Sequence, residues 1–480
     1  MSTPLSQTDS NLTTHLLEDA PRPVPITAFE RKFGHPPGLM VLFGTEMWER
    51  FSYYGMRALL ILYMTKYLFL SGHPEGVWGY GAIKGGLEAV FGPLAIQPLS
   101  SQIYGLYTGL VYFTPLFGGI LADRWLGQRK TVIVGGLVMA VGHFMMAFEQ
   151  LFFPALLVII LGNGCFKPNV STQVGTLYPQ GDPRRDRAFS IFYVGINLGA
   201  FFAPLVCGTL AASWGWHYGF AAAGVGMCLG VVFYLWGQKH LAPDTMMQAK
   251  ASAAVPGEKK VKQPLTRKEW ASVLGLVVLC ALNIVFWAVY EQQGNTMQLW
   301  ADQQTIWPTF FGWTVPSTWF QAFNPAFIFL FTPVLTWLWV RQARKKKEPS
   351  SVAKMAIGCA VLGISFLVMV LAARALGNGK GSVNWLVLTM VLVTVGELYL
   401  SPIGLSLVTK AAPARIVSMM MGMWFLSSFL GNYLSGYIGS FYSRMPKETF
   451  FLLLTVLGVG AGAAIFALQK PLKNAIGADL

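Results

Sequence analysis

Roughly a dozen stretches of about 20 predominantly apolar residues run along this chain, separated by short polar segments. A helix of that length crosses the hydrocarbon core of a bilayer. Only 12% of the residues are charged, too few to cover an ordinary water-exposed surface. We therefore predict an all-α integral membrane protein with transmembrane helices near residues 39–69, 98–122, 130–148, 152–172, 188–211, 217–237, 270–299, 320–342, 352–373, 383–410, 416–442 and 447–469.

One long polar segment, residues 238–269, divides these helices six and six. It is charged and contains helix-breaking residues, which is typical of a linker. Two sets of six helices are the layout of transporters built from two pseudo-symmetric halves. The predicted parts are a cytoplasmic N-terminal tail, two six-helix bundles joined by a cytoplasmic linker, and a cytoplasmic C-terminal tail: 1–38, 39–237, 238–269, 270–469 and 470–480.

The net charge of +14 does not indicate a nucleic-acid partner, because the basic residues gather on one side of the predicted helices. With the N-terminus inside, most of them face the cytoplasm. The opposite side receives only Lys66, Lys84, Arg374, Lys380, Arg444 and Lys447. By the positive-inside rule, this asymmetry places both termini of a multi-pass cell-membrane protein in the cytoplasm.

Several protein classes find no support in the sequence. Residues 1–38 are polar and Pro-rich, so we expect no cleavable signal. The five cysteines stand singly in apolar segments without CxxC spacing, which argues against a metal site or a disulfide framework. Neither a nucleophile with its base nor an HExxH pattern is found, so we expect no enzyme and no cofactor. A receptor would not need buried carboxylates in both halves.

The turn between the second and third predicted helices reads Gly119-Ile-Leu-Ala-Asp-Arg-Trp-Leu-Gly127-Gln-Arg-Lys. Gly127 permits a tight turn, while Asp123, Arg124 and Arg129 can form charge-assisted bonds between helix ends. We predict a latch that holds one conformation; plain positive-inside topology is the alternative. This turn is shared by the wider major facilitator group and indicates a transporter without indicating its substrate.

The first predicted helix carries most of the charges expected inside the membrane. Glu46, Glu49, Arg50, Tyr53 and Arg57 follow one another at helical spacing and share one broad face. An ionisable group at the bilayer centre costs about 2.5–3.5 kcal/mol, so such groups pair or line a water-filled path. Two carboxylates beside one guanidinium can share a proton whose affinity changes when the guanidinium moves. We predict a proton-coupling unit, with a static structural salt bridge as the alternative.

The remaining charges are distributed over both halves. Lys167 lies beside the helix-breaking Pro168, although it is near enough to the cytoplasmic end to snorkel. Glu291 and Glu397 belong to the second half. Salt bridges between cations of the first half and these carboxylates could close one mouth or the other, as alternating access requires.

A dipeptide is a zwitterion, so its site needs a cation for the carboxylate and an anion for the amine. Arg57 and Lys167 opposite Glu397 meet that need, with Asn197 and Asn324 as candidate partners of the peptide backbone. Aromatic side chains could line pockets that tolerate varied peptide side chains, although lipid-facing packing is an equal alternative for them. The aromatic candidates are Tyr53, Tyr54, Tyr112, Trp287 and Trp424.

Three motifs, found in order over residues 38–470, resemble the proton-dependent oligopeptide transporter family. They are ExxERFxYYG at Glu46–Gly55, FYxxINxG at Phe192–Gly199 and GELxLSPxGL at Gly396–Leu405. The resemblance implies the major facilitator fold and proton symport of di- and tripeptides. It also implies that Glu46, Glu49, Arg50 and Glu291 handle protons, that Arg57 and Lys167 lie near the peptide carboxylate, and that Asn324 and Glu397 lie near its amine. We also assign Ser401, in the third motif, to the substrate site.

The chain departs from the animal members of that family. They carry a histidine in helix two, whereas Gly105 falls near that place here. They also hold a large domain between helices nine and ten, where this chain has only residues 372–382. The linker 238–269 is too short and polar for the two extra helices of many bacterial members. We therefore expect a bacterial-type protein of the inner membrane with twelve helices and protons handled by carboxylates.

The expected partners are di- and tripeptides, protons and the lipid bilayer, and we expect a monomer. A porter of the same fold for nitrate, a modified amino acid or a drug is the alternative. The presence of both Lys167 and Glu397 favours peptides, because a nitrate carrier has no need of a carboxylate that binds an amine.

Overall fold

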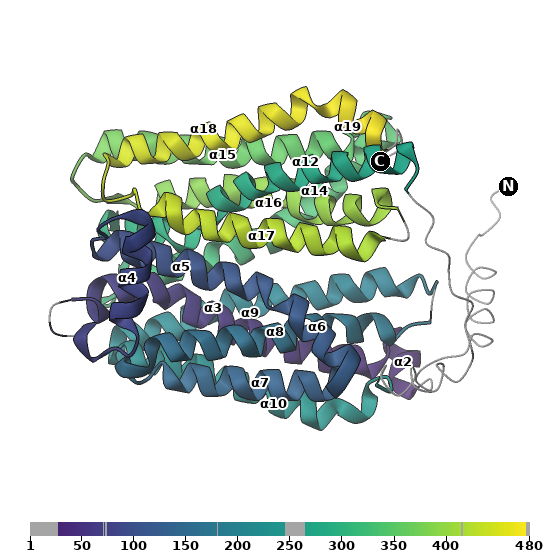
Figure 1. Cartoon of the computed structure of the whole chain (residues 1–480), viewed down its shortest axis with the longest axis horizontal. Coiled ribbons are helices and arrows are strands. Elements are labelled where there is room, and N and C mark those ends of the chain that lie inside the picture. Colours follow the sequence, from purple (N-terminus) through teal and green to yellow (C-terminus); the bar gives the residue numbers. More distant parts are fainter. Residues whose placement is uncertain are drawn as a thin grey trace.

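The computed structural model describes residues 27–70, 72, 74–179, 181–244, 265–413 and 416–476. Most of the predicted N-terminal tail and of the linker lies outside these residues. Two groups of long helices stand side by side (Figure 1). The first group contains α3 (Pro37–Tyr63), α5 (Ile96–Phe113), α6 (Pro115–Leu121), α7 (Gln128–Met145), α8 (Phe152–Thr176), α9 (Arg184–Trp214) and α10 (Trp216–Gly237).

The second group is built from α12 (Arg267–Tyr290), α13 (Thr296–Gln303), α14 (Phe323–Arg344), α15 (Ser351–Leu376), α16 (Asn384–Ala411), α17 (Val417–Gly439) and α18 (Lys447–Ala467). Short turns extend several helices. The π-helical turns η1 (Met64–Leu68) and η3 (Ala122–Leu126) follow α3 and α6. The 3₁₀ turns η6 (Glu291–Gly294) and η7 (Ser317–Ala322) flank α13 and its loop.

The helices have two distinct ends. At one, the linker end, lie α2 (Ala28–Phe33), the end of α10, the start of α12 and α19 (Gln469–Ile476) (Figure 1). The other, the loop end, holds α4 (Tyr80–Phe91) and four two-residue strands. Strand β1 (Thr305–Ile306) pairs with β4 (Gly381–Ser382), and β2 (Thr309–Phe310) forms a hairpin with β3 (Trp313–Thr314). A search for 20-residue apolar stretches misses all these short elements, because none is long enough to span a bilayer.

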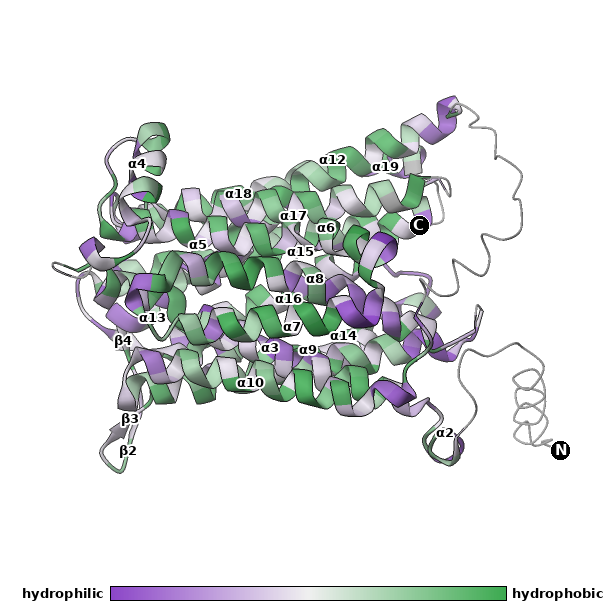
Figure 2. Ribbon diagram, turned by 60° about the horizontal axis from the view of Figure 1, so that its bottom comes forward, coloured by the Kyte–Doolittle hydropathy of each residue, from purple (hydrophilic) through white to green (hydrophobic). Residues whose placement is uncertain are grey.

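Hydrophobic residues cover the length of the helices, and hydrophilic residues gather toward the two ends (Figure 2). Within the described residues, nine helical segments are long and apolar enough to cross a membrane. The all-α membrane fold is thus confirmed. The number twelve stays a prediction. A count by hydropathy omits helices that carry buried charges. Helix α3 is an example, because Glu46, Glu49, Arg50 and Arg57 lower the hydropathy of its sequence although all four side chains are buried.

Glycines let helices approach closely, as is common inside membranes. A Cβ at Gly105 of α5 would lie 2.6 Å from the Cα of Gly436 on α17, so the two groups meet there backbone to backbone. Within the first group, a Cβ at Gly118 of α6 would overlap the carbonyl oxygen of Gly164 on α8. The next residue, Gly119, has open space at the same position.

We expect Gly118→Ala to destabilise the protein, because the new methyl group would force α6 away from α8. Overpacking of this kind costs about 1–3 kcal/mol. Gly119→Ala is the matched control and should be neutral or slightly stabilising, since alanine is the better helix former by about 1 kcal/mol. Thermal unfolding of both variants in one detergent measures the difference, and equal midpoints would contradict the packing described here.

Candidate functional site

A central cavity of about 240 Å³ lies between the two groups of helices. Nine of the eleven predicted substrate-binding residues line it: Tyr54, Arg57, Tyr112, Asn197, Trp287, Asn324, Glu397, Ser401 and Trp424. Glu291, predicted to handle protons, lines it as well. Residues far apart in the sequence are therefore brought to one space, with polar groups contributed by both halves. Tyr53 and Lys167 do not line this cavity.

One side of the cavity is formed by an ion pair between the halves. Arg57 of α3 pairs through Nη2 with Oε2 of Glu291, at the point where α12 passes into η6. Nε of Arg57 donates to the hydroxyl of Tyr104 on α5 at 2.7 Å. Both charged side chains are almost completely buried. A buried charge needs such a partner, because removal from water costs several kcal/mol per ion.

Glu397 belongs to the second half of the site. It lies on α16, and its Oε2 accepts a hydrogen bond at 2.8 Å from Nδ2 of Asn324 on α14. The same amide nitrogen lies 3.2 Å from Oγ1 of Thr394. Among the described residues, Glu397 has no cationic partner. A carboxylate held by neutral donors and open to a cavity can accept a cation from a solute.

The predicted proton-coupling unit lies inside the first group of helices. Arg50 forms a bidentate pair with Glu49, with Nη2 at 2.6 Å from Oε1, and its Nε lies 3.5 Å from Oε1 of Glu46. Asn163 of α8 donates to Oε1 of Glu49 at 3.1 Å. All three charged residues are at most 3% exposed. One guanidinium thus stands between two carboxylates, as the helical spacing predicts.

Tyr54 connects this unit with the cavity. The guanidinium carbons of Arg50 and Arg57 lie 5.9 Å and 5.8 Å from the centre of the Tyr54 ring. Arg50 also lies 5.0 Å from the ring of Tyr53, whose hydroxyl has no hydrogen-bond partner within the described chain. Arg50 is therefore adjacent to an aromatic ring that lines the cavity.

Lys167 and Asn197 approach the site less directly. Nζ of Lys167 lies 4.4 Å from the ring centre of Tyr112, a residue of the cavity wall. Nδ2 of Asn197 donates to the backbone oxygen of Tyr193, one turn earlier on α9, at 2.9 Å. Lys167 thus lies behind Tyr112 and does not line the cavity itself. The amide nitrogen of Asn197 is already hydrogen-bonded within α9.

The residues of the predicted latch are not joined to one another. Arg129 donates to the backbone oxygens of Leu241 and Ala242 at 2.6 Å each, which ties α7 to the segment after α10. Asp244 accepts from the backbone nitrogens of Gln128 and Arg129, next to Gly127 with its φ of 77°. Asp123 and Arg124 are exposed, and the described part of the chain offers them no ion pair. Their gating role stays a prediction.

Sequence reasoning missed several residues of the cavity wall. Tyr193, Tyr290, Gln293 and Gln321 line it. Gln321 donates to the backbone oxygen of Gln293 at 2.8 Å and so fixes η7 against η6. The two glutamines could have been found as amides in an apolar region, close to Glu291 and Asn324. The two tyrosines gave no such signal, because the chain is rich in aromatic residues.

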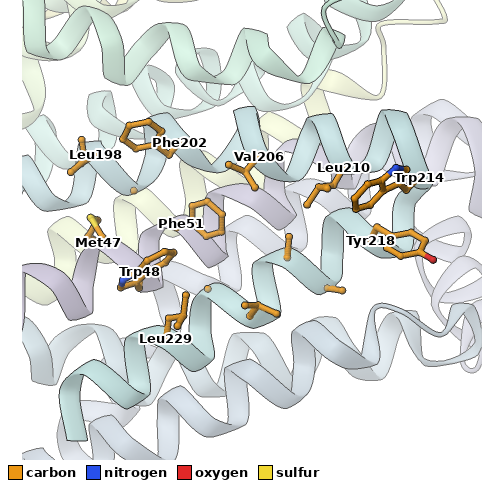
Figure 3. A pocket seen from close by; sticks show the side chains of 15 residues that line it. Met47, Trp48, Phe51, Leu198, Phe202, Val206, Leu210, Trp214, Tyr218 and Leu229 are labelled. Carbon is orange, nitrogen blue, oxygen red and sulfur yellow. The ribbon is translucent and has the colours of Figure 1, made fainter. Parts of the chain in front are cut away.

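A second, larger hollow of about 570 Å³ has a different character. It is a groove between α3, α9 and α10, into which Met47, Trp48, Phe51 and other apolar side chains point (Figure 3). No ionisable acid or base lines it, apart from the phenol of Tyr218. Phe202 and Trp214 on its rim are 47% and 66% exposed, so the groove opens to the outside of the bundle. It offers nothing that could bind a charged solute.

Polar contacts close the cavity toward the loop end. Lys66 pairs with Asp302 at 2.9 Å. Further hydrogen bonds between the halves here run from Ser101 to Asn295 (2.8 Å), from Gln97 to the oxygen of Gly439 (3.0 Å) and from Trp319 to Thr209 (3.0 Å). Two more run from the backbone nitrogen of Ser443 to Gln97 (3.1 Å) and from Arg444 to the oxygen of Pro93 (3.0 Å). Together with the meeting of Gly105 and Gly436, they separate the cavity from the loop end.

Comparison with known proteins agrees with this geometry. The model of the POT family matches residues 129–256 and 244–453. The Di-/tripeptide transporter of Lactococcus lactis subsp. cremoris is 33% identical, over 93% of this chain and 97% of its own length. The Peptide transporter YePEPT of Yersinia enterocolitica subsp. palearctica is 36% identical, over 92% and 95%. Uncharacterized transporter YclF of Bacillus subtilis is also 36% identical, over 92% and 96%.

Solved structures show the same fold. A crystal structure of a peptide transporter POT in complex with sulfate superposes with a TM-score of 0.79 at 33% identity, covering 97% of this chain and 99% of the other. A POT family transporter in complex with 5-aminolevulinic acid gives a TM-score of 0.78 at 28% identity, covering 94% and 99%.

The ion pair between Arg57 and Glu291 makes a testable energetic prediction. Arg57→Met or Glu291→Met alone leaves a buried charge without its partner, which costs about 3–5 kcal/mol. The double variant removes both charges and should recover most of that loss. Thermal unfolding in detergent measures the three variants. If the two single effects simply add in the double variant, the two side chains do not interact.

Proposed function

Because the chain belongs to the POT family, we propose that it is a proton-coupled symporter that imports di- and tripeptides by alternating access. The family consists of transporters and not of enzymes, and its solved structures have the major facilitator fold. Transport of this kind requires no cofactor besides the proton gradient.

The observation that carries the proposal is the distribution of charge in the central cavity. Arg57 of the first half supplies a cation, while Glu397 and Asn324 of the second half supply a carboxylate and an amide. A peptide with a free carboxylate and a free amine is complementary to this arrangement and would draw the halves together when it binds. Tyr54, Trp287 and Trp424 offer the side chains of the peptide apolar contact without demanding one shape.

The ion pair between Arg57 and Glu291 supports a coupling mechanism. A peptide carboxylate and the Glu291 carboxylate compete for the same guanidinium. A proton on Glu291 frees Arg57, which opens the loop end and lets the peptide carboxylate bind. Loss of that proton restores the pair, closes the loop end and releases the peptide on the other side. Glu46 and Glu49 would act in the same direction by binding or releasing Arg50, which contacts Tyr54.

The orientation follows from the charge distribution. The linker end carries most of the basic residues, so we place it in the cytoplasm of a bacterial cell together with both termini. The loop end then faces outward, and the present state is closed to the outside. A single copy holds the complete cavity, which supports a functional monomer.

Another solute with an amine and a carboxylate would satisfy the same two groups. One of the similar structures holds 5-aminolevulinic acid, and a modified amino acid therefore stays the second candidate. Competition separates the two: an excess of 5-aminolevulinic acid should reduce uptake of a labelled dipeptide less than an excess of unlabelled dipeptide does.

We expect purified protein in proteoliposomes to accumulate labelled dialanine when an inward proton gradient is applied. Glu46→Gln should reduce this accumulation at least about tenfold, yet retain exchange of internal for external dialanine, which needs no net proton movement. Glu397→Gln should reduce both, because a lost charge-assisted bond of about 1.5–3 kcal/mol weakens binding about 10- to 100-fold.

Glu448→Gln is the control for both variants, since this carboxylate pairs with Arg374 at the exposed loop end. It should behave as the wild type. If Glu46→Gln accumulates as much dialanine as the wild type when the proton gradient is applied, Glu46 takes no part in proton coupling. If folded wild-type protein takes up no dialanine, the substrate is a different one.

We expect the ion pair between Lys66 and Asp302, which joins the two halves at the loop end, to stabilise the state in which this end is closed. The side chain of Lys66 is 49% exposed and that of Asp302 is 16% exposed, so water screens the pair and its contribution is at most about 1 kcal/mol. Asp302→Asn should therefore lower the KM for external peptide by up to about fivefold, because the outward-open state becomes more populated. The exchanged pair Lys66→Glu with Asp302→Lys should restore the wild-type KM. The same exchange of Arg374 with Glu448, which lie within one half, should leave KM unchanged.

A further inference from the structure

The hairpin of β2 and β3 exposes aromatic side chains at the loop end. Phe310, Phe311 and Trp313 are 59%, 110% and 39% exposed, and Ile306 just before the hairpin is 60% exposed. From residue 303 to residue 340 the sequence has no charged residue. A loop of this composition in water would leave a large apolar patch unprotected, which soluble surfaces rarely do.

The backbone of the hairpin holds these side chains outward. Thr309 pairs with Thr314 and Phe310 with Trp313, and the hydroxyls of the two threonines lie 2.9 Å apart. Phe311 and Gly312 form the two-residue turn with φ values of 50° and 81°. Two successive positive φ values are typical of the tight hairpin turn that usually takes Asn-Gly. Phenylalanine in this conformation is strained, and its side chain is fully exposed, so packing against the described residues does not compensate.

Contacts with α9 place the hairpin at the edge of the membrane-spanning part. The ring of Trp313 lies 5.6 Å from that of Trp319, which donates to Thr209 at 3.0 Å. Thr209 stands five residues before the end of α9 at Trp214, which is about 7.5 Å along the helix axis. The base of the hairpin is thus level with the last turns of a predicted span. Its tip projects sideways from the bundle at the loop end (Figure 2).

Other exposed aromatic residues lie at the same level. Trp214 and Tyr218, at the junction of α9 and α10, are 66% and 57% exposed, with ring centres 5.8 Å apart. Tryptophan and tyrosine gather at the depth of the lipid headgroups, where their rings are partly in hydrocarbon and their polar atoms reach water. The hairpin therefore meets the surface of the bilayer at the depth that suits its side chains.

We propose that the Thr309–Thr314 hairpin is a membrane anchor, which inserts Phe310, Phe311 and Trp313 into the interface of the lipid leaflet at the loop end. The hairpin binds at the boundary between the lipid headgroups and the acyl chains. Because the hairpin carries no charged residue, this binding does not depend on the charge of the lipid. The proposal does not depend on which solute is carried. It requires only that the helices span the membrane.

The depth of a spin label tests the anchor. A nitroxide is attached at Phe311→Cys in full-length protein whose five native cysteines are replaced, and the protein is placed in nanodiscs. The control label is at Asn378, an exposed residue of another loop at the same end. We expect the label at 311 to collide mainly with oxygen, as at a depth of about 5–10 Å below the headgroups, and the label at 378 mainly with a water-soluble nickel chelate.

Each outcome decides the question. Equal nickel accessibility at both positions would show that the hairpin stands in water and would overturn the proposal. Shielding of the label at 311 from oxygen and nickel alike would mean a protein contact, such as a second copy, and would overturn it as well. A label at Phe310→Cys repeats the measurement if the first variant does not fold, and a transport assay plays no part in the result.

Discussion

The buried ion pair between Arg57 and Glu291 is the interaction on which the rest of the structure depends. It joins the two halves and forms part of the cavity wall. Around it, the close meeting of Gly105 and Gly436 permits α5 and α17 to touch without intervening side chains. Such a contact is strong only while the backbones lie together, so in the proposed cycle closure of this end would be a discrete state and not a gradual approach.

The sequence alone predicted the helical membrane fold and ten of the 21 residues that line the cavity. Apolar length located the long helices, and the charges of α3 were recognised as buried because a lipid-facing position would be too costly for them. Salt bridges between cations of the first half and Glu291 or Glu397 were predicted, but which cation pairs with which carboxylate was not. Sequence spacing shows which side chains share a face of one helix, but the rotation of α3 relative to α12 is set by packing between helices, and the spacing contains no information about it.

The same limit explains the two misplaced substrate residues. Lys167 and Tyr53 carry suitable chemistry, yet the cavity is bounded by Tyr112 and Tyr54, each of which is in contact with one of them. Tyr53 and Tyr54 are consecutive residues of α3, so they point in different directions: Tyr54 lines the cavity and Tyr53 packs inside the first group of helices. The hairpin at the loop end lies between the predicted helices 270–299 and 320–342, and it was missed for another reason: Phe-Gly replaces the usual Asn-Gly signal at its turn.

The geometry also constrains the order of events in the proposed cycle. Arg57 is engaged by Glu291 while the loop end is closed, so a peptide arriving from outside finds its carboxylate partner only after this pair has opened. A proton is the agent that can neutralise Glu291 without occupying Arg57. Proton binding must then precede peptide binding from the outside. Because Tyr54 contacts both Arg50 and Arg57, the state of the Glu46 and Glu49 pair reaches the cavity through one aromatic ring on the same helix. In the proposed cycle, proton and peptide would therefore be bound at adjacent turns of α3, and this helix would be the element that couples them.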